Sequence, residues 1–239
     1  MKRQLLLTVM LVLIAQVALA QKTYLVAVGI GDYPGYSSDL RLPTKDAATI
    51  ANLCKKNNSA SYRLLLDERA TASSIKSTMS SFFSNAGKND IVILYFSGHG
   101  CPDGFVAYDR IVTYDEIRQI LSKCKCKNKM VFADSCFSGE LRVTGNTAHG
   151  GSSKKQNVMF FLSSRSNETS LELPNYKNGV FTAFLERALR GGADYDYNRT
   201  ITASELFKFV SKGVKDATGD RQHPVMWGNF DNNMPVMKW

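Results

Sequence analysis

The stretch Ile91-Val92-Ile93-Leu94-Tyr95-Phe96-Ser97-Gly98-His99-Gly100 decides the fold class of this 239-residue chain. Its first six residues show no polar alternation, which is typical of a strand buried on both faces of a sheet. Such a strand needs helices on each face, so the chain is predicted to be an α/β protein with a mostly parallel sheet. The other expected strands are Tyr24–Ile30, Lys129–Ala133, Val158–Leu162 and the weaker Tyr62–Leu66.

Stripes of apolar residues at helical spacing separate and follow these strands. The spacing Thr113 to Glu116, and again Thr202 to Glu205, is that of a helix-starting capping box. One further helix is expected near Asp46–Lys55, and no internal repeat or second domain is apparent from the sequence. The stripes are Ile75, Met79, Phe82 and Phe83; Ile117, Ile120 and Leu121; Phe181, Phe184, Leu185, Ala188 and Leu189; and Leu206, Phe209 and Val210.

The first twenty residues have the pattern of an export signal. Lys2 and Arg3 precede an apolar run over Leu5–Leu19, and Ala18-Leu19-Ala20 has the small-x-small pattern of a cleavage site. The run is short for a membrane span of about 20 residues, so a stable membrane anchor is not expected, although an uncleaved anchor helix is the alternative. We expect residues 1–20 to be removed, and residues 21–239 to form one domain in the periplasm or outside the cell.

The chain carries a formal net charge of +9, but its basic residues are scattered. The lysine-rich patch Lys123, Lys125, Lys127 and Lys129 is interpreted as a solvated helix end and loop. A nucleic-acid partner is not expected, because no aromatic residues interleave with the charges. Of the five cysteines, Cys124 and Cys126 lie too close in sequence for a usual zinc site, and export would allow disulfides.

Two polar segments follow two of the predicted strands. Ser97-Gly98-His99-Gly100 follows Ile91–Phe96, and Asp134-Ser135-Cys136-Phe137-Ser138-Gly139 follows Lys129–Ala133. The carboxyl ends of parallel strands meet at one edge of a sheet, where α/β proteins bind ligands, so His99 and Cys136 are expected to meet there.

That pair suits nucleophilic catalysis. A free thiol with a pKa near ~8.5 is mostly protonated at neutral pH, and a neighbouring imidazole can remove that proton and later protonate a leaving amine. Backbone N–H groups near Gly100 and Cys136 could bind a developing oxyanion. Each residue alone has a plain structural alternative, a turn histidine or a small core cysteine, but their joint placement after two apolar strands favours catalysis.

These segments resemble the histidine and cysteine motifs of the caspase-like peptidases, and most closely those of metacaspases and their bacterial relatives. The resemblance extends to Ala27–Ile30, Leu42–Ala47 and Gly179–Thr182, and covers roughly Tyr24 to the C-terminus. It implies a mixed, mainly parallel six-stranded sheet and a cysteine endopeptidase with a Cys136/His99 dyad. The dyad would have no obligatory third member and require no cofactor. The chain has Asp-Ser-Cys where caspases proper have Gln-Ala-Cys, which separates it from the Asp-cleaving branch.

In metacaspases the first specificity pocket is acidic, and the matching positions are Asp46, Ser97 and Asp134. The resemblance therefore implies protein or peptide substrates cleaved after Arg or Lys, because two carboxylates would hold a cationic side chain and repel an acidic one. As alternatives, Asp46 would suit a helix N-terminus, and Asp134 could hydrogen-bond a neighbouring loop.

Two other functions stay open from the sequence. One is a different cysteine peptidase of the same broad group, such as a clostripain-, legumain- or gingipain-like enzyme. The other is a non-catalytic caspase-like binding module. The oligomeric state is not predicted.

A possible calcium loop lies in the C-terminal third. Asp194, Asp196, Asn198, Thr200 and Glu205 occupy positions 1, 3, 5, 7 and 12 of an EF-hand-type spacing. Arg199 stands where such loops have Gly, and Glu205 is already explained by the capping box, so a polar turn is the alternative.

The stretch Glu140–Gln156 has no periodicity and carries Arg142, Lys154 and Lys155. We expect either a self-cleavage loop or a loop that folds over the site.

Overall fold

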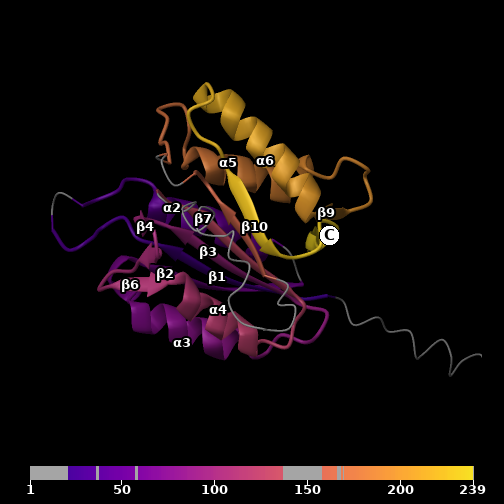
Figure 1. The fold of residues 1–239 in the computed structure, drawn as a ribbon, viewed down its shortest axis with the longest axis horizontal. Coiled ribbons are helices and arrows are strands. Elements are labelled where there is room, and N and C mark those ends of the chain that lie inside the picture. Colours follow the sequence, from indigo (N-terminus) through magenta and orange to yellow (C-terminus); the bar gives the residue numbers. More distant parts are fainter. Residues whose placement is uncertain are drawn as a thin grey trace, which may run out of the picture.

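The computed structural model describes residues 21–35, 38–56, 59–136, 158–165, 168 and 170–238. Its centre is a six-stranded sheet in the order β10-β8-β7-β3-β1-β2 (Figure 1). All neighbouring strands in it run parallel except β10, which pairs antiparallel with β8. The predicted α/β class and mostly parallel six-stranded sheet are therefore confirmed. The strands are β1 (Thr23–Gly29), β2 (Ala60–Leu66), β3 (Ile91–Ser97), β7 (Asn128–Asp134), β8 (Val158–Leu162) and β10 (Val225–Asn229).

Helices cover both faces of this sheet (Figure 1). On one face pack α2 (Pro43–Lys55), α5 (Val180–Arg187) and α6 (Ala203–Thr218); on the other pack α3 (Ala72–Phe83) and α4 (Tyr114–Lys123). Strand β3 explains this arrangement, because its Val92, Leu94 and Phe96 belong to the α3/α4 core while Ile91, Ile93 and Tyr95 belong to the opposite one. Both faces of β3 thus need apolar side chains.

The helix starts follow the predicted chemistry. Thr113 and Glu116 form a complete capping box at α4, and Thr202 with Glu205 forms another at α6. Helix α2 begins at Pro43, three residues before the expected start, because proline is well suited to the first turn of a helix. Asp46 consequently lies inside the first turn and is buried.

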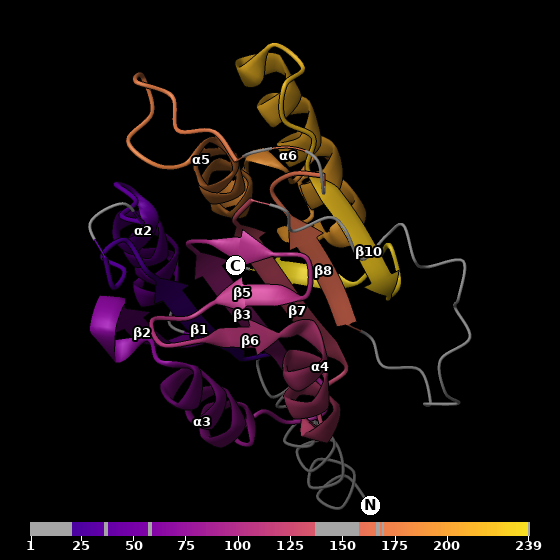
Figure 2. The same cartoon turned by 60° about the vertical axis from the view of Figure 1, so that its left-hand side comes forward.

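Several short elements were not predicted. A three-stranded sheet of β4 (Gly100–Cys101), β5 (Gly104–Val106) and β6 (Ile111–Thr113) lies between β3 and α4 in the chain (Figure 2). Phe105 stacks on Phe96 with ring centroids 4.5 Å apart, which ties this sheet to the α3/α4 core. A second pair joins β9 (Thr200–Thr202) to β11 (Pro235–Lys238). The described residues also form a 3₁₀ turn over Asp67–Arg69 and a π-helical turn over Ala188–Gly192.

The interpretation of the lysine-rich patch was wrong for one residue. Lys129 is buried, at 6% exposure, because it lies within β7, in agreement with the expected strand Lys129–Ala133 and not with a solvated loop. Residues 1–20, with the expected export signal, and residues 137–157, with the Glu140–Gln156 loop, lie outside the described residues. Among the helices that the structure describes, none has the length and apolarity to cross a bilayer.

Candidate active site

Strands β3 and β7 bring the two predicted motifs together. They are paired in parallel with Ser97 opposite Asp134, so the residues that follow each strand leave the sheet side by side. The Gly98 N–H donates to the Asp134 carbonyl at 3.3 Å. A cavity of about 310 Å³ opens at this edge, and both His99 and Cys136 line it. The expected meeting of the two motifs is therefore present in the structure.

The contacts of His99 fix its tautomer. Its Nε2 lies 2.7 Å from the Ser38 carbonyl oxygen. Because a carbonyl oxygen can only accept, this contact requires the proton on Nε2 and leaves the lone pair on Nδ1. The ring is therefore held as a base at Nδ1, which is the atom that a thiol proton would need to reach.

Tyr33 supports the backbone and ring of His99. The Tyr33 hydroxyl accepts from the His99 N–H at 2.9 Å and donates to the Val106 carbonyl at 2.9 Å. Its ring lies against the imidazole, with centroids 4.7 Å apart. Gly98 has a φ of +155°, and an added Cβ there would lie 2.6 Å from the Tyr33 hydroxyl, so a larger residue would displace Tyr33.

Cys136 is half-buried, and burial raises the pKa of its thiol. The thiol is therefore mostly protonated at neutral pH and needs a base for attack. Gly100 lies against this residue, since an added Cβ would be 2.3 Å from the Cys136 carbonyl oxygen. Gly98 and His99 line the cavity itself, while Gly100 contacts the Cys136 backbone beside it.

The predicted pocket residues Asp46, Ser97 and Asp134 all line the same cavity and are 2%, 2% and 7% exposed. The Ser97 hydroxyl donates to Asp46 Oδ2 at 3.0 Å. Gly179 lies between the two carboxylates, because an added Cβ would be 2.3 Å from Asp134 Oδ2 and 3.2 Å from Asp46 Oδ2. The structure thus brings together the three residues predicted from separate parts of the chain.

Neutral donors hold both carboxylates. Asp46 Oδ1 accepts from Asn178 Nδ2 at 2.8 Å and from the Gly179 N–H at 3.0 Å. Asp134 Oδ2 accepts from the Thr182 N–H at 3.1 Å and from its hydroxyl at 2.7 Å. Asp134 therefore contacts the first turn of α5 as well as the cavity. The first turn of α2 around Asp46 is also compatible with the helix-dipole alternative.

Burial raises the pKa of both groups. The pKa of Asp46 rises to about 8, from burial first and from the neighbouring Asp134 second. Burial raises the pKa of Asp134 to about 6. Two buried carboxylates in one cavity do not both ionise readily, and a bound cation would favour their ionised forms.

Several cavity residues were not predicted as site residues. Ser135 of the cysteine motif also lines the cavity, together with Leu40, Pro43, Ser170, Leu171, Glu172 and Gly179. Glu172 Oε1 accepts from the Leu42 N–H at 3.2 Å, and its other oxygen lies 3.5 Å from Arg41 Nε. Pro43 and Gly179 lie at helix starts that the resemblance covers, whereas Leu40 and Ser170–Glu172 lie in irregular segments that only the tertiary structure brings to the cavity.

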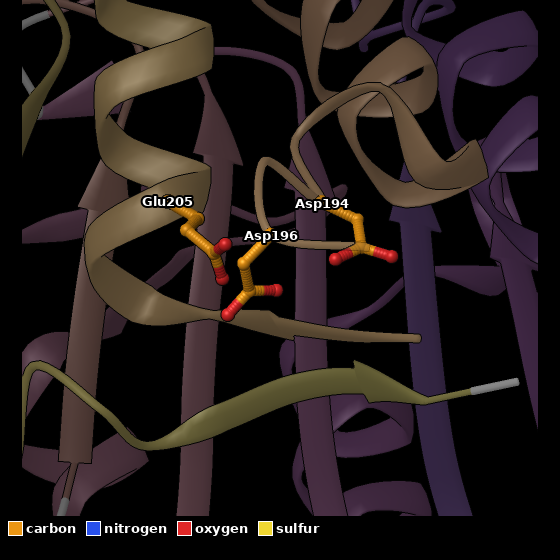
Figure 3. A group of neighbouring side chains, drawn as sticks. All are labelled: Asp194, Asp196 and Glu205. Atoms are coloured by element: carbon orange, nitrogen blue, oxygen red, sulfur yellow. The ribbon is translucent and has the colours of Figure 1, made fainter. Parts of the chain in front are cut away.

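The candidate calcium residues also gather. Oxygen atoms of Asp194, Asp196 and Glu205 lie within 4.8 Å of one another between the loop and the start of α6 (Figure 3). Asn198 donates to Asp196 Oδ2 at 2.7 Å, and Thr200 begins β9. Arg199 adopts a φ of 63°, the left-handed conformation for which Gly is preferred.

Comparisons with known proteins agree with this architecture. Among solved structures, a Geobacter sulfurreducens protein matches with a TM-score of 0.66 and 17% identity, covering 90% of this chain and 97% of that one. Caspase-1 from Spodoptera frugiperda matches with a TM-score of 0.64 and 13% identity, covering 91% of this chain and 89% of that one. A search of curated proteins found no match. Residues 22–233 match the family model of the caspase domain. The chain therefore belongs to the caspase-domain family of cysteine peptidases.

Proposed function

We propose that the protein is an exported cysteine endopeptidase that cleaves after Arg or Lys. The observation that carries this proposal is the cavity lined by His99 and Cys136 together with the buried carboxylates Asp46 and Asp134. The first pair suits attack on a peptide bond, and the second suits a cationic side chain held beside that bond.

The reaction begins when His99 Nδ1 takes the proton of the Cys136 thiol. The sulfur then attacks the substrate carbonyl carbon, and the N–H groups of Gly100 and Cys136 stabilise the resulting oxyanion. The imidazolium gives its proton to the leaving amine, which leaves an acyl group on the sulfur. Water, deprotonated by the same imidazole, hydrolyses this thioester and restores the thiol. The Ser38 carbonyl accepts from Nε2, so it also stabilises the imidazolium formed during the reaction.

The pocket chemistry favours a guanidinium or ammonium group. Arg could bridge the two carboxylates through its planar donors, whereas Lys would bind as a single point charge. An acidic side chain would bring a further negative charge beside these two carboxyl groups, and like-charge juxtaposition costs several kcal/mol.

Fluorogenic peptides ending in Arg, Lys, Asp or Asn test the proposal. We expect turnover of the Arg and Lys peptides by the wild type and none by Cys136→Ala. The binding-module alternative requires that the folded wild type cleave no peptide at all. A preference for the Asn or Asp peptide would contradict the basic specificity.

The raised carboxyl pKa values predict a pH dependence of cation binding. Below about pH 6 both carboxyls are mostly protonated, and they ionise as the pH rises toward the Asp46 pKa of about 8. The inhibition constant of agmatine, a guanidinium amine, should therefore fall at least about tenfold between pH 5.5 and 8.5. Asp134→Asn leaves Asp46 as the one titrating carboxyl of the pair, so it should weaken this dependence. A pH-independent inhibition constant in the wild type would show that these carboxyls do not titrate on binding.

We also propose that the acidic loop binds calcium weakly. Three carboxylates and the Asn198 amide are suitable ligands for a hard cation, while the Arg199 charge opposes it. A site in the ~10⁻⁴–10⁻³ M range would raise the melting temperature by roughly 3–5 °C at ten times its Kd.

Arg199→Gly tests this loop directly. It removes the opposing charge and places Gly where φ is 63°, so calcium affinity should rise at least about tenfold. Isothermal titration with calcium, on the wild type and this variant, measures the effect, and Asp194→Asn is the control in which binding is lost. If none of the three proteins released or absorbed heat on titration with calcium, the loop would be a polar turn without a calcium site.

A further inference from the structure

One wall of the cavity is an irregular segment that follows β8. Ser170, Leu171 and Glu172 line the cavity from this segment. The Ser170 side chain also hydrogen-bonds the Asp134 carboxylate. The position of this wall therefore determines the shape of the pocket and whether Ser170 can hydrogen-bond Asp134.

Gln222 ties the two ends of this segment together from outside the pocket. It is fully buried, at 0% exposure, in the turn between α6 and β10. Its Nε2 donates to the Ser163 carbonyl at 2.9 Å, and its Oε1 accepts from the Leu171 N–H at 3.0 Å. Its own N–H donates to the Thr218 hydroxyl at 3.2 Å, so the amide is anchored to α6. The side-chain amide supplies the donor and the acceptor from two neighbouring atoms.

The next residue, His223, contacts the same segment through Glu168. Its N–H donates to Glu168 Oε2 at 2.8 Å, and its Nδ1 lies 2.8 Å from Glu168 Oε1. Its Nε2 lies 3.1 Å from Asp220 Oδ1. The other charged groups here are Arg165, 3.6 Å from Glu168, and Lys215, 3.3 Å from Asp220.

We propose that Gln222 and His223 are positioning residues: through Ser163, Leu171 and Glu168 they hold the Ser170–Glu172 wall of the specificity pocket in place. Their role in catalysis rests on the proposed peptidase function.

Amide hydrogen exchange over residues 170–180 tests the clamp without any need for activity. Gln222→Met keeps the side-chain length but removes both hydrogen bonds, and we expect protection of this segment to fall at least about tenfold. Gln222→Glu keeps only the acceptor for Leu171 and serves as the second variant if the first does not fold. Gln119→Met, at an exposed glutamine of α4, is the matched control and should leave protection unchanged.

His223→Gln tests the contribution of the imidazole. It removes the ring that contacts both Glu168 and Asp220, so protection of residues 170–180 should fall. Unchanged protection in His223→Gln, or in a folded Gln222 variant, would overturn the proposal.

Kinetics then link the clamp to the pocket. Gln222→Met should raise KM for an Arg peptide about tenfold, while kcat and the rate of Cys136 alkylation by iodoacetamide stay within about twofold. A loss confined to kcat would overturn the assignment to the pocket. If wild type cleaved no Arg peptide while the exchange results held, the proposed function would fail and the clamp would stand.

Discussion

Cys136→Ala and His99→Ala should each lower kcat/KM on an Arg peptide by roughly 10⁴-fold or more. Cys136→Ala removes the sulfur that attacks the substrate carbonyl. His99→Ala removes the base that accepts the thiol proton, and burial of Cys136 raises the pKa of this thiol, so it stays protonated. Steady-state kinetics on purified variants measure the effect, with thermal melts to show that the fold is intact. Because the two residues act on one proton, the double variant should be little slower than either single one.

Cys101→Ala is the matched control for the first prediction. Cys101 is also half-buried and lies two residues after His99, but its thiol donates to the Gly104 carbonyl at 3.4 Å within the small sheet. This variant should keep kcat/KM within about threefold of the wild type. Retention of a tenth of wild-type turnover in Cys136→Ala, with contaminating peptidase excluded, would contradict the assigned nucleophile.

The second large effect concerns the pocket. Wild type should prefer Arg over Asp substrates by at least about 100-fold, which corresponds to only ~2.7 kcal/mol. Asp134→Asn and Asp46→Asn keep the side-chain volume but remove one charge each, and each should lower this preference at least about tenfold. The ratio of kcat/KM values on matched peptides measures it.

Asp32→Asn is the control, because Asp32 is an exposed carboxylate of the β1–α2 loop outside the cavity lining. It should leave the preference unchanged. If Asp134→Asn slowed cleavage of Arg and uncharged substrates equally, the carboxylate would act only through its contacts with Thr182 at the start of α5.

The sequence predicted the central strands because each is buried on both faces. In β3, the residues Ile91 to Phe96 all belong to one core or the other, so the apolar run needed no tertiary information. Strand β10 was missed because it is an edge strand in which Val225 is buried while Gly228 and Asn229 are exposed. Its pairing with β8 comes from tertiary structure rather than from a pattern of its own.

The candidate site was only partly predictable for a similar reason. His99 and Cys136 directly follow strong strands, so their meeting followed from the parallel sheet. The oxygen that fixes the His99 tautomer belongs to the Ser38 backbone. Every residue has a backbone carbonyl, so the sequence could not predict this contact. Glu172 and Gln222 lie in irregular segments, where position depends on packing against the rest of the fold.

Covalent labelling tests the central claim most directly. The protein is incubated with a peptidyl-arginyl chloromethyl ketone and, separately, with the matched aspartyl reagent, and the adduct is located by peptide mass mapping. We predict one adduct, on Cys136, formed at least about 100-fold faster with the arginyl reagent and absent from Cys136→Ala. An adduct on another cysteine, or equal rates with the two reagents, would contradict a basic-specific peptidase with Cys136 as its nucleophile.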